Sequence, residues 1–259
     1  MNRLSTRNRM LVGLTLFSMF FGAGNLIFPP YLGAMAGTKT PLAMLGFAIT
    51  AIGFPILGVI AVAHAGSLDE LAGRVHPVFA KVFTLLIYLS IGPCLAIPRT
   101  ASTSFEMAVT PFLSGDTSKT MIQLIYSILF FAVAFYVSLS PEKLTHLLGR
   151  FTSPCLLILI GIMFVGCLLA PPAGYGESYG LYAQSPVLQG FLGGYQTMDA
   201  IAALNFGIII AMNINNRGVT ERSAVVKEIT YAGWIAGLIF LVVYGAIAHV
   251  GAVAGGAYG

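Results

Sequence analysis

An apolar segment that interrupts itself constrains this chain more than any other feature. The uncharged run from Met10 to Thr38 is long enough to cross a bilayer of about 30 Å at about 1.5 Å per residue. Its middle, residues 18–30 (Ser-Met-Phe-Phe-Gly-Ala-Gly-Asn-Leu-Ile-Phe-Pro-Pro), has the composition of a helix break. We expect two half-helices, roughly 9–21 and 26–36.

Each residue type in this middle stretch has a reason to end or restart a helix. Gly22 and Gly24 weaken a helix and allow close approach of backbone or ligand. Asn25 is expected to cap the second half-helix, with Pro29 and Pro30 near its first turn. Broken backbone in hydrocarbon is tolerated where it faces protein, water or a solute. The break therefore predicts either a binding site or a kink that serves packing alone.

The composition indicates an all-α, polytopic membrane protein. Hydrophobic residues make up 57% of the chain and charged residues only 8%, which no soluble domain of this length needs. Long uncharged stretches predict about seven transmembrane helices in one membrane domain, residues 1–259. These spans are roughly 10–36, 40–63, 78–109, 119–140, 144–170, 185–213 and 227–251.

The basic residues predict the orientation of the chain rather than a nucleic-acid partner. With the N-terminus inside, one side carries only Lys39 and Lys119. The other side carries Arg3, Arg7, Arg9, Arg74, Lys81, Lys143, Arg150, Arg217, Arg222 and Lys227. Because short cytoplasmic connections are enriched in Lys and Arg, we expect a multi-pass protein of the cell (inner) membrane with a cytoplasmic N-terminus.

Two longer connections have their own patterns. Residues 64–77 are charged and amphipathic, and Ser67 ahead of two acidic residues predicts a short capped helix at the interface. The external loop 171–184 is rich in Gly and Tyr, which suits an aromatic interface belt or a flexible outer gate. In the third span, Pro93 and Pro98 interrupt one long helix beside Arg99, which would contact a substrate, pair with Glu106 or reach the outer interface.

The sixth predicted span contains a second interruption. Residues 189–200 (Gln-Gly-Phe-Leu-Gly-Gly-Tyr-Gln-Thr-Met-Asp-Ala) combine adjacent glycines, polar side chains and one acid inside an apolar segment. Asp199 would bind a coupling cation, take a proton, cap the second half-helix or form an internal salt bridge. These alternatives stay open on the residues alone.

The sequence contains no constellation typical of an enzyme. His64, His76, His146 and His249 lack partners at metal-ligand spacing, and Cys94, Cys155 and Cys167 fit buried packing positions without a disulfide framework. Motifs for a nucleophile elbow, a phosphate loop or a zinc protease are absent from the sequence. We therefore expect neither an enzyme nor a cofactor.

Two Gly-interrupted spans, the first and the sixth, are the pattern of an inverted-repeat transporter. A repeat of five spans turns its second copy upside down, which is the geometry that alternating access requires. Residues 1–170 would form the first repeat and residues 185–259 an incomplete second one. The residues alone thus predict a secondary transporter with its substrate between spans one and six.

Three stretches carry a family resemblance: residues 20–30, residues 91–101 (Ile-Gly-Pro-Cys-Leu-Ala-Ile-Pro-Arg-Thr-Ala) and residues 194–204 (Gly-Tyr-Gln-Thr-Met-Asp-Ala-Ile-Ala-Ala-Leu). Together they resemble the BrnQ-type branched-chain amino acid:cation symporters (LIVCS). The resemblance implies uptake of leucine, isoleucine and valine by symport with Na⁺ or H⁺, on a fold similar to the bacterial leucine transporter.

The resemblance also implies where ligands bind. Backbone amides of Ala23 and Gly24, beside Gly22 and Asn25, would hold the substrate carboxylate. Carbonyls of Ser18 and Phe21 would hold a coupling Na⁺. The amino group and side chain of the substrate would lie near Tyr195, Gln196, Thr197 and Met198, with an apolar pocket supplied by Phe20, Phe21, Ile27 and Met198.

Members of this family have roughly a dozen spans, so with seven we expect a fragment or truncated frame that lacks half of the cation site. One alternative is a symporter of the same fold for another amino acid or an amine. Another is a membrane fragment or sensor that does not transport. Because one methylene is worth about 1 to 3 kcal/mol in a pocket, weak discrimination among the three branched substrates is expected.

Overall fold

Helices make up the regular structure of the protein. The computed structural model describes residues 3–113, 118–139 and 153–258, and within these ranges every regular element is helical. The expected all-helical class is therefore confirmed. Lys143, Arg150, His146 and the start of the predicted span 144–170 lie outside the described residues.

The predicted spans correspond to helices or to helix pairs. The first is α1 (Thr6–Phe20) with α2 (Ala23–Ala36), and the second is α3 (Thr40–Ala48) with α4 (Phe54–Ala65). A 3-10 turn, Gly37–Lys39, joins the two spans, and a π-helical turn, Ile49–Gly53, lies within the second. The other helices are α5 (Leu68–Gly73), α6 (Pro77–Leu89), α7 (Ala96–Ala108), α8 (Lys119–Ser138), α10 (Ser153–Leu169), α11 (Gly180–Gln184), α12 (Pro186–Tyr195), α13 (Asp199–Asn215) and α14 (Arg222–Tyr258).

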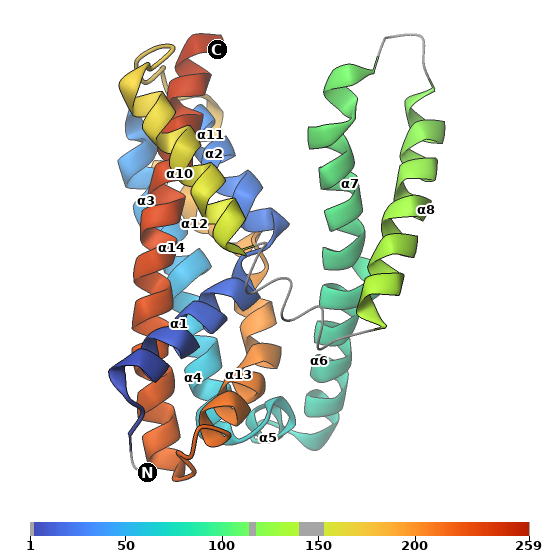
Figure 1. Ribbon diagram of the computed structural model, residues 1–259, viewed down its shortest axis with the longest axis vertical. Coiled ribbons are helices and arrows are strands. Elements are labelled where there is room, and N and C mark those ends of the chain that lie inside the picture. Colours follow the sequence, from blue (N-terminus) through green and yellow to red (C-terminus); the bar gives the residue numbers. More distant parts are fainter. Residues whose placement is uncertain (1–2, 114–117, 140–152, 259) are drawn as a thin grey trace. The chain divides into compact units, whose positions relative to one another are not determined.

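Several helical stretches are long and apolar enough to cross a membrane. Among the described residues there are four, or five if α12 and α13, bent by 46°, count as one span. The four are Ala23–Ala65, Pro77–Phe112, Lys119–Ser138 and Arg222–Ala257. The chain turns at Gly37, which has a φ of 49°, and α3 and α4 then return toward the end of the bundle that holds the N-terminus (Figure 1).

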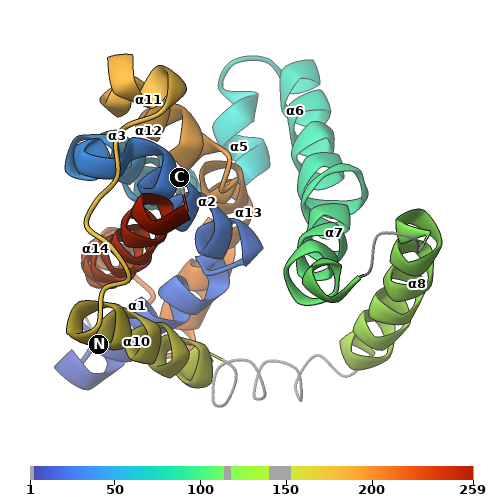
Figure 2. The same ribbon diagram turned by 90° about the horizontal axis from the view of Figure 1, so that it is seen from above.

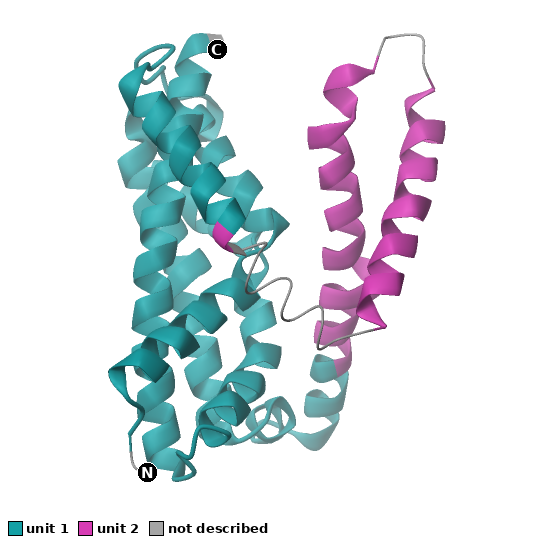
Figure 3. Cartoon of the chain, viewed as in Figure 1, with its two compact units in different colours: residues 1–84, 155–259 teal, residues 85–154 magenta. Residues whose placement is uncertain are grey.

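The chain divides into two compact units, shown in Figure 3. The first unit contains residues 1–84 and 155–259, and the second contains residues 85–154. In the second unit, α7 and α8 are joined by a hydrogen bond from the Tyr126 hydroxyl to Ser104 Oγ (3.0 Å) and by the rings of Tyr126 and Phe105, 5.5 Å apart. Both interruptions predicted from the sequence belong to the first unit.

Glycines bring helices of the first unit into backbone contact. Figures 1 and 2 show α14 beside α1 and α2. A Cβ at Gly33 would lie only 2.0 Å from the carbonyl oxygen of Ala248, so no side chain fits between α2 and α14. Between α3 and α12, a Cβ at Gly46 would lie 1.9 Å from the carbonyl oxygen of Val187. Such small-residue contacts are the usual way that membrane helices pack closely.

The two longer connections are fixed by hydrogen bonds, within the first connection and between the second and the end of the first span. Ser67 Oγ accepts from the Glu70 amide (3.0 Å), which confirms the predicted cap of α5. The loop 171–184 pairs with the end of α2, because the Tyr179 amide donates to the Met35 carbonyl (2.8 Å) and the Thr38 amide to the Gly176 carbonyl (3.0 Å). This loop therefore satisfies the last backbone groups of α2, while its role at the interface stays a prediction.

The third span is interrupted where its first proline was expected to act. A π-helical turn occupies Ser90–Cys94, and Gly92 leaves helical geometry with a ψ of −118° just before Pro93. The Glu106 carboxylate forms an ion pair with Lys119 (3.0 Å). The role of Arg99 stays a prediction.

Candidate functional site

The first break is a short extended segment between α1 and α2. Phe21 has a ψ of 97° and Gly22 a ψ of −171°, so both leave the helical region. The Gly22 amide donates to Asn25 Oδ1 (3.4 Å), and the Asn25 amide donates to the Gly22 carbonyl (3.1 Å). In a continuous helix these two amides would donate to the carbonyls of Ser18 and Phe21. The break thus removes the helical donors of both carbonyls.

Two details of the first break differ from the expectation. Asn25 is the third residue of α2 rather than its cap, and its side chain reaches back to the amide of Gly22. Pro29 and Pro30 lie inside α2 instead of near its first turn, because α2 starts at Ala23, earlier than the predicted position 26. The predicted break itself is confirmed, with α1 ending at Phe20.

The second break is a hydrogen-bonded turn between α12 and α13. Amides of Gln196, Thr197 and Met198 each donate to a carbonyl three residues earlier, at 3.1, 3.4 and 3.0 Å. Met198 has a φ of 68°, in the left-handed region that non-glycine residues seldom occupy. Thr197 Oγ1 donates to the Gly194 carbonyl (2.8 Å) and accepts from the Asp199 amide (3.4 Å). The chain thus turns tightly and starts α13 at Asp199.

The two breaks meet through a buried group of three polar side chains. Asn25 Nδ2 donates to Asp199 Oδ2 (2.7 Å) and to the Tyr244 hydroxyl (2.5 Å). The Tyr244 hydroxyl donates to the same Asp199 oxygen (3.4 Å). Asn25 is 1% exposed and Asp199 is 4% exposed, so neither depends on bulk water for its hydrogen bonds. Both half-helices that follow a break, α2 and α13, thus present their first turns to one polar centre.

Tyr244 was not anticipated from the sequence. It lies in α14, which is the seventh predicted span. A single tyrosine among apolar residues looks there like an ordinary aromatic residue of the core. A signal was present, since a tyrosine deep in an apolar span needs a partner for its hydroxyl. The rings of Phe47 and Phe240 pack against it at 5.3 and 5.1 Å and fix its orientation.

The other predicted residues separate into three groups. Gly22, Ala23 and Gly24 form the break and the first turn of α2, next to Asn25. Tyr195 instead packs its ring against Phe54 (5.7 Å) and Phe191 (5.6 Å). Thr197 and Met198 shape the second break through their backbone and hydroxyl.

A cavity of about 440 Å³ lies in the first unit between α2, α11 and α12. Its lining combines aromatic and aliphatic side chains with two amides: Ile27, Phe28, Tyr31, Tyr182, Gln189, Leu192, Gly193 and Gln196. Ile27 and Gln196 are therefore the predicted residues that line it. Such a mixture suits a small ligand with an apolar side chain and polar ends.

Aromatic rings at the end of α1 and at Phe21 form a layer against α13 and α14, the helices that carry Asp199 and Tyr244. Phe17 packs on Phe240 (4.6 Å) and on Phe21 (5.0 Å), while Phe20 packs on Phe206 of α13 (5.4 Å). Phe20 and Phe21, predicted to line an apolar pocket, thus belong to this aromatic layer. Phe240 also packs on the ring of Tyr244, so the layer is connected to the polar centre through these two rings.

The apolar helices, with polar side chains buried where two of them break, define a polytopic membrane protein. Among the described residues, no group of three His, Cys, Asp or Glu side chains is placed to hold a metal ion. Residues 5–258 match the family described as branched-chain amino acid transport protein. The chain belongs to this family.

Relatives in bacteria support the same assignment. The chain is 39% identical over 257 residues to the branched-chain amino acid permease BraB of Bacillus subtilis, covering 99% of this chain and 58% of BraB. It is 40% identical to the permease BrnQ of the same organism, over 96% of this chain and 57% of BrnQ. It is also 39% identical to the branched-chain amino acid transport system 3 carrier protein of Pseudomonas aeruginosa, over 97% of this chain and 57% of the carrier.

The chain thus spans less than three fifths of the length of these relatives. No solved structure matches it. The relatives are permeases and carriers, so the expectation that this chain is not an enzyme is confirmed.

Proposed function

We propose that this protein takes up leucine, isoleucine and valine by symport with a cation, Na⁺ or H⁺, through alternating access around its two broken helices. Family membership supports the substrate class, since the relatives are described as branched-chain amino acid permeases. The observation that carries the mechanism is the Asn25–Asp199 hydrogen bond, which joins the first turns of α2 and α13 at one buried point.

The substrate would bind beside the first break. Half-helix N-termini carry partial positive charge, so amides of Ala23 and Gly24 suit a carboxylate. The cavity of about 440 Å³, with Ile27 of the same half-helix and Leu192 in its lining, suits a branched aliphatic side chain. Its two glutamine amides provide polar groups for the other end of the substrate.

The coupling cation would bind near Asp199. A buried carboxylate, the Tyr244 hydroxyl and the carbonyls of Ser18 and Phe21 are oxygen donors of the kind that Na⁺ takes at a broken helix. Proton coupling would use the Asp199 carboxylate itself. Asp199 would thus act as a cation ligand or proton acceptor rather than only as a helix cap.

The packing of the broken helices supports an inverted repeat similar to that of the bacterial leucine transporter. In the first broken span, Gly13 of α1 lies against Ile235 and Gly33 of α2 against Ala248, so this span runs parallel to α14, the seventh. In the sixth span, Gly190 of α12 lies against Ala43 and Gly207 of α13 against Val62, so this span runs parallel to the second.

Exchanging spans one with six and two with seven converts either arrangement into the other. A repeat of five spans makes this exchange, which is why the two parallel pairs support it. The orientation with a cytoplasmic N-terminus, in the cell membrane, belongs to the same proposal and rests on the distribution of Lys and Arg.

Uptake by the natural product tests the proposal. An antibody against residues 64–77 recovers that product from native membranes, and a marker of residues 1–259 calibrates its size. Reconstituted in vesicles, it should accumulate labelled leucine when an inward Na⁺ or proton gradient is imposed, with competition by isoleucine and valine. Accumulation that depends on neither gradient would contradict cation coupling. Competition by unrelated amino acids, without competition by isoleucine and valine, would contradict the substrate class.

Two glycine variants locate the substrate within that assay. Gly24→Leu should abolish leucine binding while membrane insertion is kept, because Gly24 is buried at the start of α2 and a side chain there would fill the space for the carboxylate. Gly166→Leu in α10 is the matched control, since a Cβ at Gly166 would meet nothing within 4 Å. Near-normal binding by Gly24→Leu would remove the first break from the substrate site.

A further inference from the structure

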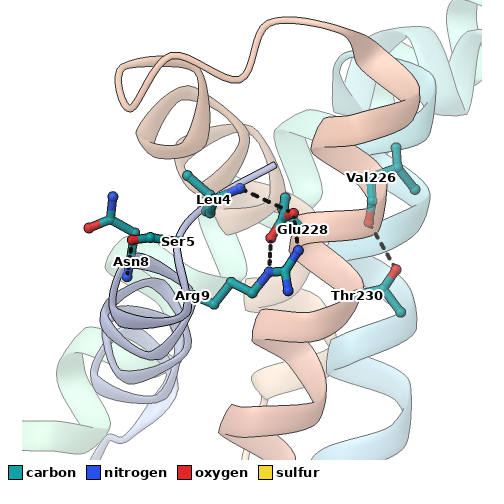
Figure 4. A network of polar contacts seen from close by, with 7 residues as sticks. All are labelled: Leu4, Ser5, Asn8, Arg9, Val226, Glu228 and Thr230. Atoms are coloured by element: carbon teal, nitrogen blue, oxygen red, sulfur yellow. Dashed lines mark hydrogen bonds and ion pairs between the residues drawn. The ribbon is translucent and has the colours of Figure 1, made fainter. Parts of the chain in front are cut away.

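Glu228 is a carboxylate buried at the end of α14 nearest the N-terminus of the chain. It is only 2% exposed, yet both of its oxygens are bonded (Figure 4). Arg9 holds them in a two-pronged contact, with Nε 2.6 Å from Oε2 and Nη2 2.7 Å from Oε1. The Leu4 amide adds a third hydrogen bond, to Oε1, at 3.3 Å.

These three hydrogen bonds to Glu228 all come from residues 4–9, which contain the cap and the first turn of α1. Within it, Leu4 is buried, Ser5 caps α1 by accepting from the Asn8 amide (3.3 Å), and Arg9 lies 4.6 Å over the ring of Tyr231. The segment 4–9 is thus folded onto α14 around one charge. Removing it would leave a buried carboxylate without these partners, which is strongly unfavourable.

The other end of α1 is the first break, where the helical hydrogen-bond ladder stops. Between the two ends, α1 carries Phe17, which packs on Phe240 of α14, and Phe20, which packs on Phe206 of α13. These two helices supply Tyr244 and Asp199 to the polar centre. Because the helical backbone stops at Phe20, α1 can move apart from α2 as one piece. The contacts of segment 4–9 with α14, together with the packing of Gly13 on Ile235, oppose that movement.

We propose that the Arg9–Glu228 pair is a clamp that keeps α1 packed on α14 and α13, and that its release is the step that opens the site on the side of the N-terminus. This inference rests on the proposed transport function, which supplies the substrate site and the cytoplasmic side of the membrane. Arg9 and Glu228 are positioning residues in this scheme, because neither contacts the centre itself.

The chain also contains an exposed ion pair, far from α1 in the sequence, that serves as a comparison. Lys119 and Glu106 also form an ion pair, at 3.0 Å, but their side chains are 51% and 49% exposed. Water screens such a pair, and its loss has little effect on structure. Glu106→Gln is therefore the control for Glu228→Gln.

Accessibility of a single cysteine measures the clamp without any transport. Ala224 is 6% exposed and lines a cavity of about 220 Å³ together with Arg3, Arg9 and Lys227, so it becomes accessible when the segment 4–9 leaves α14. Ala224→Cys is introduced after Cys94, Cys155 and Cys167 are replaced by Ser. The rate of labelling by a membrane-impermeant maleimide is then measured in inside-out vesicles.

Removal of the positive charge of Arg9 should have the largest effect on the labelling rate. Arg9→Gln should raise the labelling rate at least tenfold, because it leaves the carboxylate buried and charged. Glu228→Gln should raise it less, since Gln still accepts from Leu4, and Arg9→Lys should give an intermediate rate because it keeps the charge but loses the two-pronged contact. Glu106→Gln should leave the rate unchanged.

The double variant Arg9→Gln/Glu228→Gln separates a clamp from simple packing. Two neutral amides can bond each other, so labelling should fall back below the rate of Arg9→Gln alone. Equal rates in Arg9→Gln and the double variant would assign the effect to lost packing on Tyr231 and overturn the proposal, as would a wild-type rate in both Arg9→Gln and Arg9→Lys. Because the measurement requires no uptake, failure of the clamp and failure of the transport proposal give different results.

Discussion

The two breaks both interrupt a helical span, but they do so with different hydrogen bonds. At the first, the backbone is extended over Phe21 and Gly22, and a side chain from the following helix, Asn25, accepts the hydrogen bond of the Gly22 amide. At the second, the backbone folds into a tight turn whose amides bond within the turn, and Thr197 supplies the side-chain bonds.

This difference means that the first break depends on the centre and the second does not. Asn25 bonds Gly22 with its oxygen while its nitrogen bonds Asp199 and Tyr244, so the extended backbone and the polar centre share one side chain. The turn of Gln196–Met198 stays satisfied whatever happens at Asp199 Oδ2. Perturbing the centre should therefore loosen α2 more than α13.

Removing the charge of the centre should have the largest effect. We expect Asp199→Asn to lower leucine uptake about 10- to 100-fold and to change its Na⁺ or pH dependence, because hydrogen bonds to a charged group are worth about 1.5–3 kcal/mol. The amide keeps an acceptor for Asn25, so the fold should persist. Uptake is measured across a series of Na⁺ concentrations and pH values.

Glu106→Gln, which removes an exposed carboxylate from the second unit, should leave the same curves unchanged. An unaltered cation dependence in Asp199→Asn would contradict the proposed role of Asp199 as cation ligand or proton acceptor and would leave it a structural role only.

Removing only the hydroxyl of Tyr244 should have a smaller effect, concentrated on the first break. Tyr244→Phe keeps the ring contacts with Phe47 and Phe240 but removes the acceptor for Asn25 and the donor to Asp199. The bond with Asn25 is neutral and worth about 0.5–1.5 kcal/mol, and the bond to Asp199 is long at 3.4 Å, so the affinity for leucine should fall about 2- to 10-fold. Hydrogen exchange should rise at the amide of Gly22 before it rises at Met198, and the reverse order would contradict the dependence inferred above.

The smallest effect is expected at Met198, where the second break stores backbone strain. Its φ of 68° favours glycine, so Met198→Gly should change the free energy of unfolding by less than about 1 kcal/mol, since relief of strain offsets the added freedom of the unfolded chain. Thermal unfolding in detergent measures the change. Met198→Val is the comparison, and it should destabilise the protein because a β-branched residue is disfavoured there; equal stability of both variants would show that the turn is unstrained.

The sequence predicted the helices and both breaks because their causes are local. Glycines, a long uncharged run and a cluster of polar residues in an apolar span act within a few positions of each other. The exact role of Asn25 was wrong because α2 starts earlier than Asn25 itself, and the location of Pro29 and Pro30 followed the same error. Local patterns place a break better than they place the first residue after it.

Contacts between distant parts of the chain were harder to predict from the sequence. Tyr244 looked like an apolar core residue, and its bonds to Asn25 and Asp199 depend on the packing of α14 against α2 and α13. Arg9 was interpreted as a topology signal among other basic residues, although it also satisfies a carboxylate 219 positions away. The ring contact of Tyr195 with Phe54 also joins distant parts of the chain, while a place for Tyr195 near the substrate stays a prediction. Each of these outcomes needed the tertiary arrangement.

The long helix α14 connects the Arg9–Glu228 pair with the polar centre of Asn25, Asp199 and Tyr244. Glu228 and Tyr244 stand on one 37-residue helix without a proline, separated by about 24 Å of rise. Such a helix acts as a lever: a tilt of about 5° about the Glu228 end carries the Tyr244 end sideways by about 2 Å, enough to break a hydrogen bond. A small change in lipid thickness, which alters helix tilt, should therefore be felt at the polar centre.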